Sequence, residues 1–243
     1  MHEFSKVKGL IFDYGGTIDT NGIHWAEVIW NCYEKAGVLV EKQHFLDAYV
    51  EVERLLGSEN LVKSNFSMKE TLDLKLELQL KCLNKQGILP ENTKTLSQFI
   101  AISNHCYNFA SSILKKTKPV LRELTEVYPS ALVSNFYGNL DAVINDFGIS
   151  NYFAGVIESA KVGVRKPDCG IFAIAVEILG AKPSEIAVIG DSMKNDILPA
   201  QSLGCKTIWL KGKEFDSDSG SNTAADVVVT DFSDLKEIFL NKT

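Results

Sequence analysis

Short apolar runs that each end in polar residues recur along this chain of 243 residues. Buried parallel strands have this continuous apolar pattern, because helices cover both faces of such a sheet. The runs extend over about 7–13, 131–134 and 186–190, and they end in Asp13, Ser134-Asn135 and Gly190-Asp191. Three predicted strands that end in polar groups indicate one site assembled from distant segments.

The region between the first two runs has helical spacing instead. Over 25–36, apolar residues recur every three or four positions, and Gly37 ends the pattern. Comparable spacing predicts helices near 45–56 and 96–114. Over 72–80, leucines alternate with polar residues as in a strand, but the intervening Asp, Lys, Glu and Gln are not β-branched. We therefore predict a helix with one apolar stripe, formed by Leu72, Leu76, Leu80 and Leu83.

From Lys118 onward, predicted helices and strands alternate. Pro119 is expected to begin a helix that runs to about 127, and Pro167 a helix that Gly180 ends. Further strands are expected near 156–158, 207–210 and 226–229, further helices near 140–147, 195–203 and 233–240, and a loop over 214–225. This alternation predicts an α/β fold, a Rossmann-like three-layer parallel sheet core with an inserted all-helical domain.

The inserted helices are expected to act as a lid. The core is predicted to comprise residues 1–20 and 117–243, and the helical insertion residues 21–116. An insertion after the first strand lies over the carboxyl ends of the strands, where open α/β sheets bind ligands. Hinges are expected near 20–22 and 115–118. Trp25 and Trp30 fall at helical spacing in the insertion, so we predict that they are core residues rather than substrate contacts.

Composition and charge narrow the class of protein. The formal net charge of −6 argues against nucleic acid as a partner, because phosphate backbones select basic surfaces. Five scattered cysteines lack metal-type spacing and are predicted to be reduced and mostly buried. There is no signal-peptide pattern and no apolar stretch long enough to span a bilayer, so a cytoplasmic protein without a membrane partner is expected.

The polar residues at the strand ends have ordinary explanations when each is taken alone. Asp13 could cap a turn, Ser134 could be a turn residue, and Asp191 could cap a helix. A single lysine such as Lys166 is usually exposed. As a set, however, carboxylates and a lysine at the ends of buried strands offer a nucleophile, ligands for a hard divalent cation and positive charge for an anionic substrate.

Four short motifs occur in order along the chain. They are Asp13-Tyr14-Gly15-Gly16-Thr17, Ser134 at its strand end, Lys166-Pro167-Asp168, and Gly190-Asp191-Ser192 with Asp196. In these motifs the chain resembles the haloacid dehalogenase-like hydrolase superfamily, whose members are mostly phosphatases. The resemblance covers nearly the whole predicted core, and the inserted helices are similar to the helical C1-type cap that many members carry after the first strand.

The resemblance implies a Mg²⁺-dependent phosphatase that acts on a small phosphorylated metabolite. Asp13 would attack phosphorus and form an aspartyl-phosphate, the covalent route open to carboxylates. Mg²⁺ would be held by Asp13, Asp191 and the backbone carbonyl of Gly15. Lys166 would neutralise charge on Asp13 and the phosphate, and Asp196 would orient Lys166 or a metal-bound water.

Three further residues are expected around the phosphate. By resemblance, Ser134 and the backbone amide of Asn135 would bind phosphate oxygens. Thr17, close to the nucleophile, would support the geometry of the substrate site. Serine and threonine at such positions can also be purely structural.

Gly15 departs from the family pattern. Most phosphatases of the superfamily carry a second aspartate at this position, two residues after the nucleophile, which protonates the leaving oxygen and later activates water. Its absence puts proton transfer in doubt, a contribution typically worth about 10²–10⁴-fold. Asp19 and His24 are the nearest candidates in sequence for a substitute acid or base, although an exposed turn aspartate and a helix-capping histidine are the commoner explanations.

Two other hypotheses stay open. One is carbon–phosphorus or carbon–halogen hydrolysis, because members with those activities also lack the second aspartate. A phosphonatase would need a lysine of the insertion for a Schiff base, with Lys63, Lys69 and Lys75 available, whereas the retained Asp191 and Asp196 disfavour a metal-free dehalogenase. The other is a protein that binds a phosphorylated ligand without catalysis. No oligomeric state is predicted.

Overall fold

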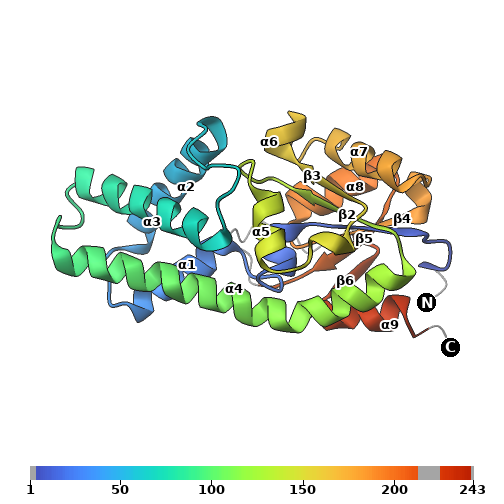
Figure 1. Ribbon diagram of the computed structural model, residues 1–243, viewed down its shortest axis with the longest axis horizontal. Helices are drawn as coiled ribbons and strands as arrows, with labels where there is room; N and C mark the ends of the chain where they lie inside the picture. Colours follow the sequence, from blue (N-terminus) through green and yellow to red (C-terminus); the bar gives the residue numbers. More distant parts are fainter. Residues whose placement is uncertain (1–3, 213–224, 242–243) are drawn as a thin grey trace.

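In the computed structural model of the protein, which describes residues 4–212 and 225–241, six parallel strands form one sheet in the order β3-β2-β1-β4-β5-β6 (Figure 1). The strands are β1 (Gly9–Phe12), β2 (Ser130–Ser134), β3 (Gly155–Glu158), β4 (Ile186–Gly190), β5 (Lys206–Leu210) and β6 (Val227–Val229). Each of the predicted strands is present, with ends shifted by no more than two residues. The loop predicted over 214–225 lies almost entirely outside the described residues.

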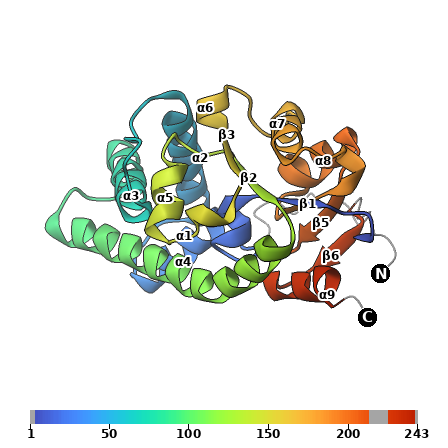
Figure 2. The ribbon, with the colours of Figure 1, turned by 45° about the vertical axis from the view of Figure 1, so that its right-hand side comes forward.

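Helices cover both faces of this sheet, which gives the predicted three layers (Figure 2). They are α1 (Trp25–Lys35), α2 (Lys42–Ser58), α3 (Met68–Lys85), α4 (Thr93–Val127), α5 (Leu140–Asp146), α6 (Ser159–Val162), α7 (Gly170–Leu179), α8 (Leu198–Leu203) and α9 (Leu235–Phe239). The side chains of β1 alternate between the two layers. Leu10 and Phe12 pack with α4, α5 and α9, whereas Ile11 packs with α7 and α8. The α/β fold is therefore as predicted.

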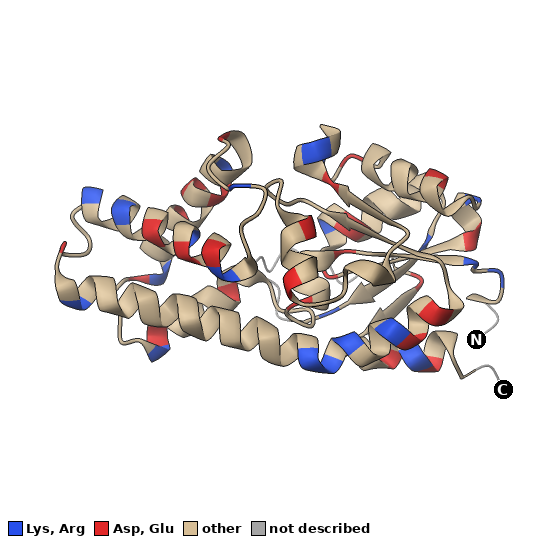
Figure 3. Cartoon of the chain, in the orientation of Figure 1, with Lys and Arg blue, Asp and Glu red and all other residues tan. Residues whose placement is uncertain are grey.

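The first four helices follow β1 in sequence; α1, α2 and α3 lie to one side of the sheet, and α4 runs from there back against it (Figure 1). The segment with alternating leucines is helical, because the predicted stripe of Leu72, Leu76, Leu80 and Leu83 is buried on one face of α3. Ser67 begins this helix with a capping box, since its side chain accepts from the Glu70 amide and the Glu70 carboxylate accepts from Ser67. Basic and acidic residues are interspersed along α3 (Figure 3).

Two predictions about prolines were wrong. Pro119 does not begin a helix; α4 continues through it from Thr93 to Val127, so the predicted domain boundary at 116/117 falls inside one helix. Pro167 does not begin α7 either. It follows a cis peptide bond, and α7 begins at Gly170, whose amide donates to the Asp168 carboxylate at 2.8 Å. The Asp168 carboxylate, and not the proline, thus satisfies the first amide of this helix.

The remaining expectations concern cysteines and membrane spans. All five cysteines are free, and every one except Cys169 is buried. Within the described residues, none of the helices combines the length and the apolar character that crossing a bilayer requires. Gly37 and Gly180 end their helices with positive φ angles of 63°, as the sequence pattern predicted.

Candidate active site

The strand order brings the polar strand ends together. β1 lies in the middle of the sheet, with β2 on one side and β4 on the other. Neighbouring strands lie about 5 Å apart, so Asp13, Ser134 and Asp191, which follow or end these strands, meet at one edge. All three line a cavity of about 190 Å³. This is the carboxyl edge of the sheet, next to the point where the chain reverses its direction of strand addition.

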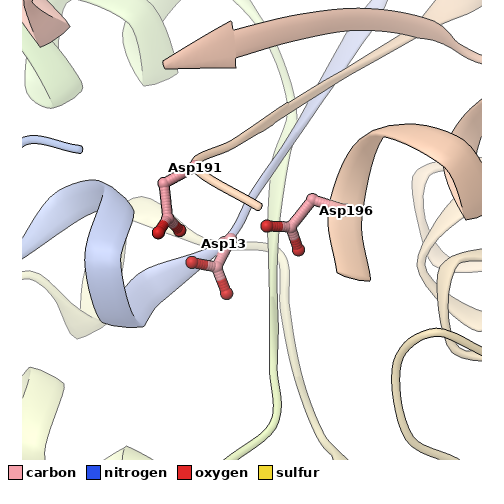
Figure 4. A group of neighbouring side chains, drawn as sticks. All are labelled: Asp13, Asp191 and Asp196. Carbon is pink, nitrogen blue, oxygen red and sulfur yellow. The ribbon is translucent and has the colours of Figure 1, made fainter. Parts of the chain in front are cut away.

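Three carboxylates point toward one another in this cavity (Figure 4). Asp13, Asp191 and Asp196 each offer an oxygen, and these atoms lie within 4.8 Å of one another. The side chains are buried. Burial, followed by the charges of Asp13 and Asp196, raises the pKa of Asp191 well above its usual range. Burial is also the main reason that the pKa of Asp196 rises to about 6. Such crowding of negative charge is relieved by a cation.

Lys166 supplies one positive charge to this cluster. Its Nζ donates to Asp13 Oδ1 at 2.5 Å and to Asp196 Oδ1 at 2.6 Å. Burial alone would lower the pKa of Lys166, but the two carboxylates outweigh burial and raise it. Lys166 therefore stays protonated. With three carboxylates and one ammonium, the cluster keeps an excess of negative charge that matches a hard divalent cation.

Thr17 holds two of the carboxylates in place. Its hydroxyl lies 2.9 Å from Asp13 Oδ2 and 3.1 Å from Asp191 Oδ1, and it accepts from the Asp191 amide at 3.0 Å. Thr17 itself is buried and does not line the cavity. Its hydroxyl therefore ties the two carboxylates together from beneath the cavity surface.

Ser134, the last residue of β2, and Asn135, which follows it, lie on the other side of Asp13 from Asp191. The Asn135 side chain clamps the backbone of Lys166, because its Nδ2 donates to the Lys166 carbonyl at 3.0 Å and its Oδ1 accepts from the Lys166 amide at 2.9 Å. The sequence suggested a role for the backbone amide of Asn135 only, so this positioning role of the side chain was missed. The Ser134 hydroxyl lines the cavity.

Asp196 occupies the position expected of a supporting residue. Besides accepting from Lys166, it accepts from the Ser192 amide at 3.0 Å through its other oxygen. Gly190 makes this possible, because a Cβ on Gly190 would lie 2.4 Å from the Asp196 Cβ. Gly16 is constrained in the same way: its φ is +101°, and a Cβ there would lie 2.4 Å from Asp191 Oδ2.

A family model of haloacid dehalogenase-like hydrolases matches residues 7–204, which include every residue of this cluster. The chain belongs to this family. In this haloacid dehalogenase-like hydrolase, the fold brings the four sequence motifs together around one cluster of carboxylates and a lysine.

Named relatives include several phosphatases. The glyceraldehyde 3-phosphate phosphatase of Pyrococcus furiosus is 29% identical over 57% of this chain and 59% of its own length. The phosphoglycolate phosphatase of Pectobacterium atrosepticum is 24% identical over 97% of this chain and 93% of its own. The phosphoserine phosphatase of Thermus thermophilus is 30% identical over 38% of this chain and 35% of its own. The first and third matches thus span about three fifths and one third of those relatives.

Solved structures share the fold. The HAD-hydrolase YfnB from Bacillus subtilis, in a crystal structure bound to magnesium, superposes with a TM-score of 0.57 at 15% identity, covering 96% of this chain and 99% of that one. A dehalogenase with an intermediate complex superposes with a TM-score of 0.63 at 13% identity, covering 96% and 97%. At these identities the likeness concerns the fold alone.

Gly15, the departure from the family pattern, lies in the cavity wall with ordinary backbone angles of φ −80° and ψ 115°. A Cβ on Gly15 would meet only Trp25, at 3.8 Å. Trp25 was predicted to be a core residue. It does pack against the core, but it also lines the cavity beside Gly15, whereas Trp30 packs on Phe45 with ring centroids 5.2 Å apart. The space next to Gly15 therefore accommodates a Cβ in ordinary contact with Trp25.

Asp19 is buried behind Trp25 and is not among the residues that line the cavity. One of its oxygens accepts from the Gly16 amide at 2.8 Å and the other from Trp25 Nε1 at 2.9 Å. Burial raises the pKa of Asp19 to about 7. Although this value suits proton transfer near neutral pH, both oxygens already accept hydrogen bonds, and Asp19 does not line the cavity. The position of Asp19 indicates that it orients Trp25 and the turn after Asp13.

His24 does line the cavity, and it also caps α1. Its Nδ1 accepts from the Ala26 amide at 3.2 Å, so the neutral ring carries its proton on Nε2. Protonation of Nδ1 would break the capping hydrogen bond. Through Nδ1, His24 thus serves as the cap of α1. The structural role anticipated for this histidine is present.

Of the three lysines considered in the insertion, Lys75 alone lines the cavity; Lys63 is exposed and Lys69 faces another pocket. Lys75 is buried in an ion pair with Glu53, which the sequence did not single out. The sequence did contain a signal for a partner of Lys75, because this lysine interrupts the apolar face of α3 between Leu72 and Leu76. A lysine on a buried face requires a partner or a ligand.

Proposed function

We propose that the protein is a Mg²⁺-dependent phosphatase that hydrolyses a small phosphorylated metabolite through an aspartyl-phosphate on Asp13. The observation that carries this proposal is the contact of Lys166 with Asp13 in a cluster of three buried carboxylates. A nucleophile next to a protonated lysine and an excess of negative charge suits attack on an anionic phosphoryl group. Relatives named as phosphatases of small phosphorylated compounds support the reaction class.

The donor set fits magnesium. Oxygen ligands are the ones that Mg²⁺ prefers, and Asp13, Asp191 and the carbonyl of Gly15 would hold it, with Asp196 in support. When bound, the ion would neutralise charge on the phosphate and on the carboxylates. The raised pKa of Asp191 reflects the same unbalanced charge. Cytoplasmic location remains an expectation from the sequence.

The phosphate group would occupy the cavity between β1 and β2. Lys166 would contact its oxygens while remaining paired with Asp13, and the Ser134 hydroxyl and the Asn135 amide would donate to the others. Thr17 would keep the Asp13 carboxylate in one orientation. Asn135 would in addition keep the Lys166 backbone in place.

The reaction would proceed in two displacements at phosphorus. In the first, an oxygen of Asp13 forms a bond to phosphorus, the bond from phosphorus to the ester oxygen breaks, and the leaving alkoxide takes a proton. In the second, water attacks the aspartyl-phosphate, which releases phosphate and restores the carboxylate. Because Asp19 does not line the cavity and Nδ1 of His24 is engaged in capping α1, the proton would come from water. Substrates with leaving groups of low pKa are therefore expected to react fastest.

The helical segment over residues 21–116 would act as a cap that closes over the substrate. Residues of α1, α2 and α3 already line the cavity together with Asp13. Its volume of about 190 Å³ lies below the roughly 300–1,000 Å³ of drug-sized ligand sites, which suits a small metabolite. A hinge at 20–22 lies in the turn before α1, whereas movement at 115–118 would require α4 to bend within one helix.

The other reaction types fit less well. A Schiff base would need a neutral lysine, but the charge of Glu53 outweighs burial and raises the pKa of Lys75. The carboxylate cluster suits a metal, which a metal-free dehalogenase does not need. A protein that only binds a phosphorylated ligand would use the same cavity without turnover.

A panel of phosphorylated metabolites, assayed for phosphate release with Mg²⁺ and with a chelator, tests the proposal. We expect release with Mg²⁺ only, and its loss by at least about 10³-fold in Asp13→Asn, which keeps the size of the side chain but removes the nucleophile. Asp141→Asn is the matched control, because Asp141 is exposed on α5. Phosphate release that survives in Asp13→Asn, or silence across the panel, would contradict the proposal.

A further inference from the structure

Glu53 of α2 and Lys75 of α3 form an ion pair in the wall of the cavity that holds Asp13. Lys75 Nζ lies 2.5 Å from Glu53 Oε1. Neither residue belongs to the four motifs, and the proposed phosphoryl chemistry uses neither. Because that chemistry takes place at the strand ends, groups on the helical segment face the remainder of a bound phosphate ester.

Tyr137 joins this pair to the core. Its hydroxyl accepts from Lys75 Nζ at 3.0 Å and donates to Glu53 Oε2 at 2.7 Å. Lys75 Nζ also lies 5.3 Å from the centroid of the Tyr137 ring and 5.7 Å from that of Tyr49. The three polar groups form a closed triangle, which fixes both charges in the cavity wall.

The charge of Lys75 is already matched. The side chain of Glu53 is 29% exposed and that of Lys75 only 8%, so Glu53 is the more accessible residue of the pair, while its Oε1, which faces Lys75, is buried. Among the described residues that line the cavity, the other lysine is Lys166, which contacts Asp13 and Asp196. His24 is the further basic residue there, and its charge acts on Glu53. Arg165 lines a neighbouring pocket instead. A second anionic group on a substrate would therefore meet a carboxylate and no unpaired cation.

The hydrogen-bonding capacity of the pair suits a different group. A lysine ammonium has three N–H donors, of which Glu53 and Tyr137 engage two. The carboxylate keeps lone pairs that its partners do not use. One donor and one acceptor thus remain side by side in the wall. A hydroxyl group both donates and accepts, so it can satisfy the two together.

From this arrangement, and on the basis of the proposed phosphatase function, we infer that Glu53 and Lys75 determine specificity. They select phosphate esters whose far end carries hydroxyl groups over esters whose far end carries a carboxylate. The pair acts on the choice of substrate and not on the reacting phosphorus.

Glycerol 3-phosphate and 3-phosphoglycerate form a matched pair of probes. Both are esters of a primary alcohol, so the need for a proton on the leaving oxygen cancels in the ratio of their kcat/KM values. They differ in having a hydroxymethyl or a carboxylate group at the far end. We expect the wild type to prefer glycerol 3-phosphate by at least tenfold, mainly through KM.

Substitutions of the two partners should shift this preference in opposite directions. Glu53→Gln leaves the charge of Lys75 unmatched and should reduce the preference at least tenfold, whereas Lys75→Met leaves Glu53 unmatched and should increase it. Glu51→Gln is the control, because Glu51 lies on the same helix but outside the cavity. A defect in folding alone would lower both rates and leave the ratio unchanged.

The outcomes separate this inference from the function on which it rests. Phosphate release with a wild-type preference for 3-phosphoglycerate, or with the same ratio in Glu53→Gln as in the wild type, would overturn the inference while leaving the phosphatase in place. Failure to release phosphate from either probe and from the metabolite panel would overturn the proposed function and this inference with it.

Discussion

Lys166 and Lys75 are the buried lysines of the described chain, and their surroundings differ in charge balance. Lys166 contacts two carboxylates and lies in a cluster of three, so negative charge remains in excess. Lys75 has one carboxylate partner, Glu53, and the two charges cancel. The cluster around Lys166 needs a further cation to balance its charge. The charges of Lys75 and Glu53 balance each other without a ligand.

This difference indicates separate roles for the sheet edge and for the helical segment. The unbalanced cluster lies at the ends of β1 and β4, where an anionic phosphoryl group and a divalent ion can complete it. The balanced pair lies on α2 and α3, where it can recognise neutral polar groups. Chemistry and specificity would thus be assigned to residues from separate segments of the chain.

Replacing each lysine by methionine should break the comparison most clearly. Lys166→Met removes the cation beside the nucleophile, so kcat for the best substrate of the panel should fall by about 10²–10³-fold. Lys75→Met should change kcat for the same substrate by less than tenfold, because Lys75 does not contact Asp13. The measurement is steady-state phosphate release with Mg²⁺, with thermal melting to verify that both variants fold. Equal losses in the two variants would contradict a division between chemistry and specificity.

The unbalanced cluster should also make the metal-free protein sensitive to pH. Burial raises the pKa of Asp196 in the folded protein to about 6, from 3.8 when unfolded. Between these values the folded state binds more protons, so the stability contribution present below about pH 4 is lost as the pH rises through about 6. The loss amounts to at most about 3 kcal/mol. Thermal melting with a chelator should show it, and Mg²⁺ or Asp196→Asn should reduce it.

A metal-free protein whose melting temperature is the same at pH 5 and pH 7.5, with no response to Mg²⁺, would contradict this account of the cluster. The pair of Glu53 and Lys75 offers an internal reference. The charge of Lys75 and hydrogen bonds outweigh burial and lower the pKa of Glu53, so its stabilising contribution is present above the usual glutamate pKa and is lost in acid. The two clusters should therefore respond to pH with opposite sign.

A carboxylate at position 15 tests whether the strand-end cluster lacks a proton donor. Gly15→Asp should raise kcat at least tenfold on substrates with poor leaving groups, because a Cβ there fits beside Trp25 and a carboxyl group can protonate the leaving oxygen. Aryl phosphates, which need less protonation, should gain less. Gly15→Asn is the matched control without an acid. No gain in Gly15→Asp would indicate that another group already supplies the proton.

Much of the sheet could be predicted from the sequence, because the apolar runs that form β1, β2 and β4 are buried on both faces. The start of a helix at Pro119 was wrong for a physical reason. A proline within a helix costs about 3 kcal/mol, but the buried side chains of Val120, Leu121 and Leu124 each contribute about 1.5–3 kcal/mol through burial. Packing onto the sheet therefore outweighs the local preference.

In the candidate site, the residues that belong to the motifs were predictable and the others were not. Asp13, Lys166 and Asp191 follow predicted elements and are brought together by the strand order. Glu53 and Tyr137 carry no such signal, because their meeting depends on how α2 packs against the loop after β2. Helical periodicity assigns a residue to one face of its helix, but it does not say which distant residue that face will meet.

Calorimetric titration with Mg²⁺ tests the central claim, that the carboxylates at the strand ends form the cation site, most directly. The measurement compares the wild type with Asp191→Asn and Glu53→Gln, each of which removes one carboxylate from the same cavity. We predict that the wild type and Glu53→Gln bind one ion with similar affinity and that Asp191→Asn binds it at least tenfold more weakly. Absence of binding in the wild type, or equal affinity in all three proteins, would contradict the account.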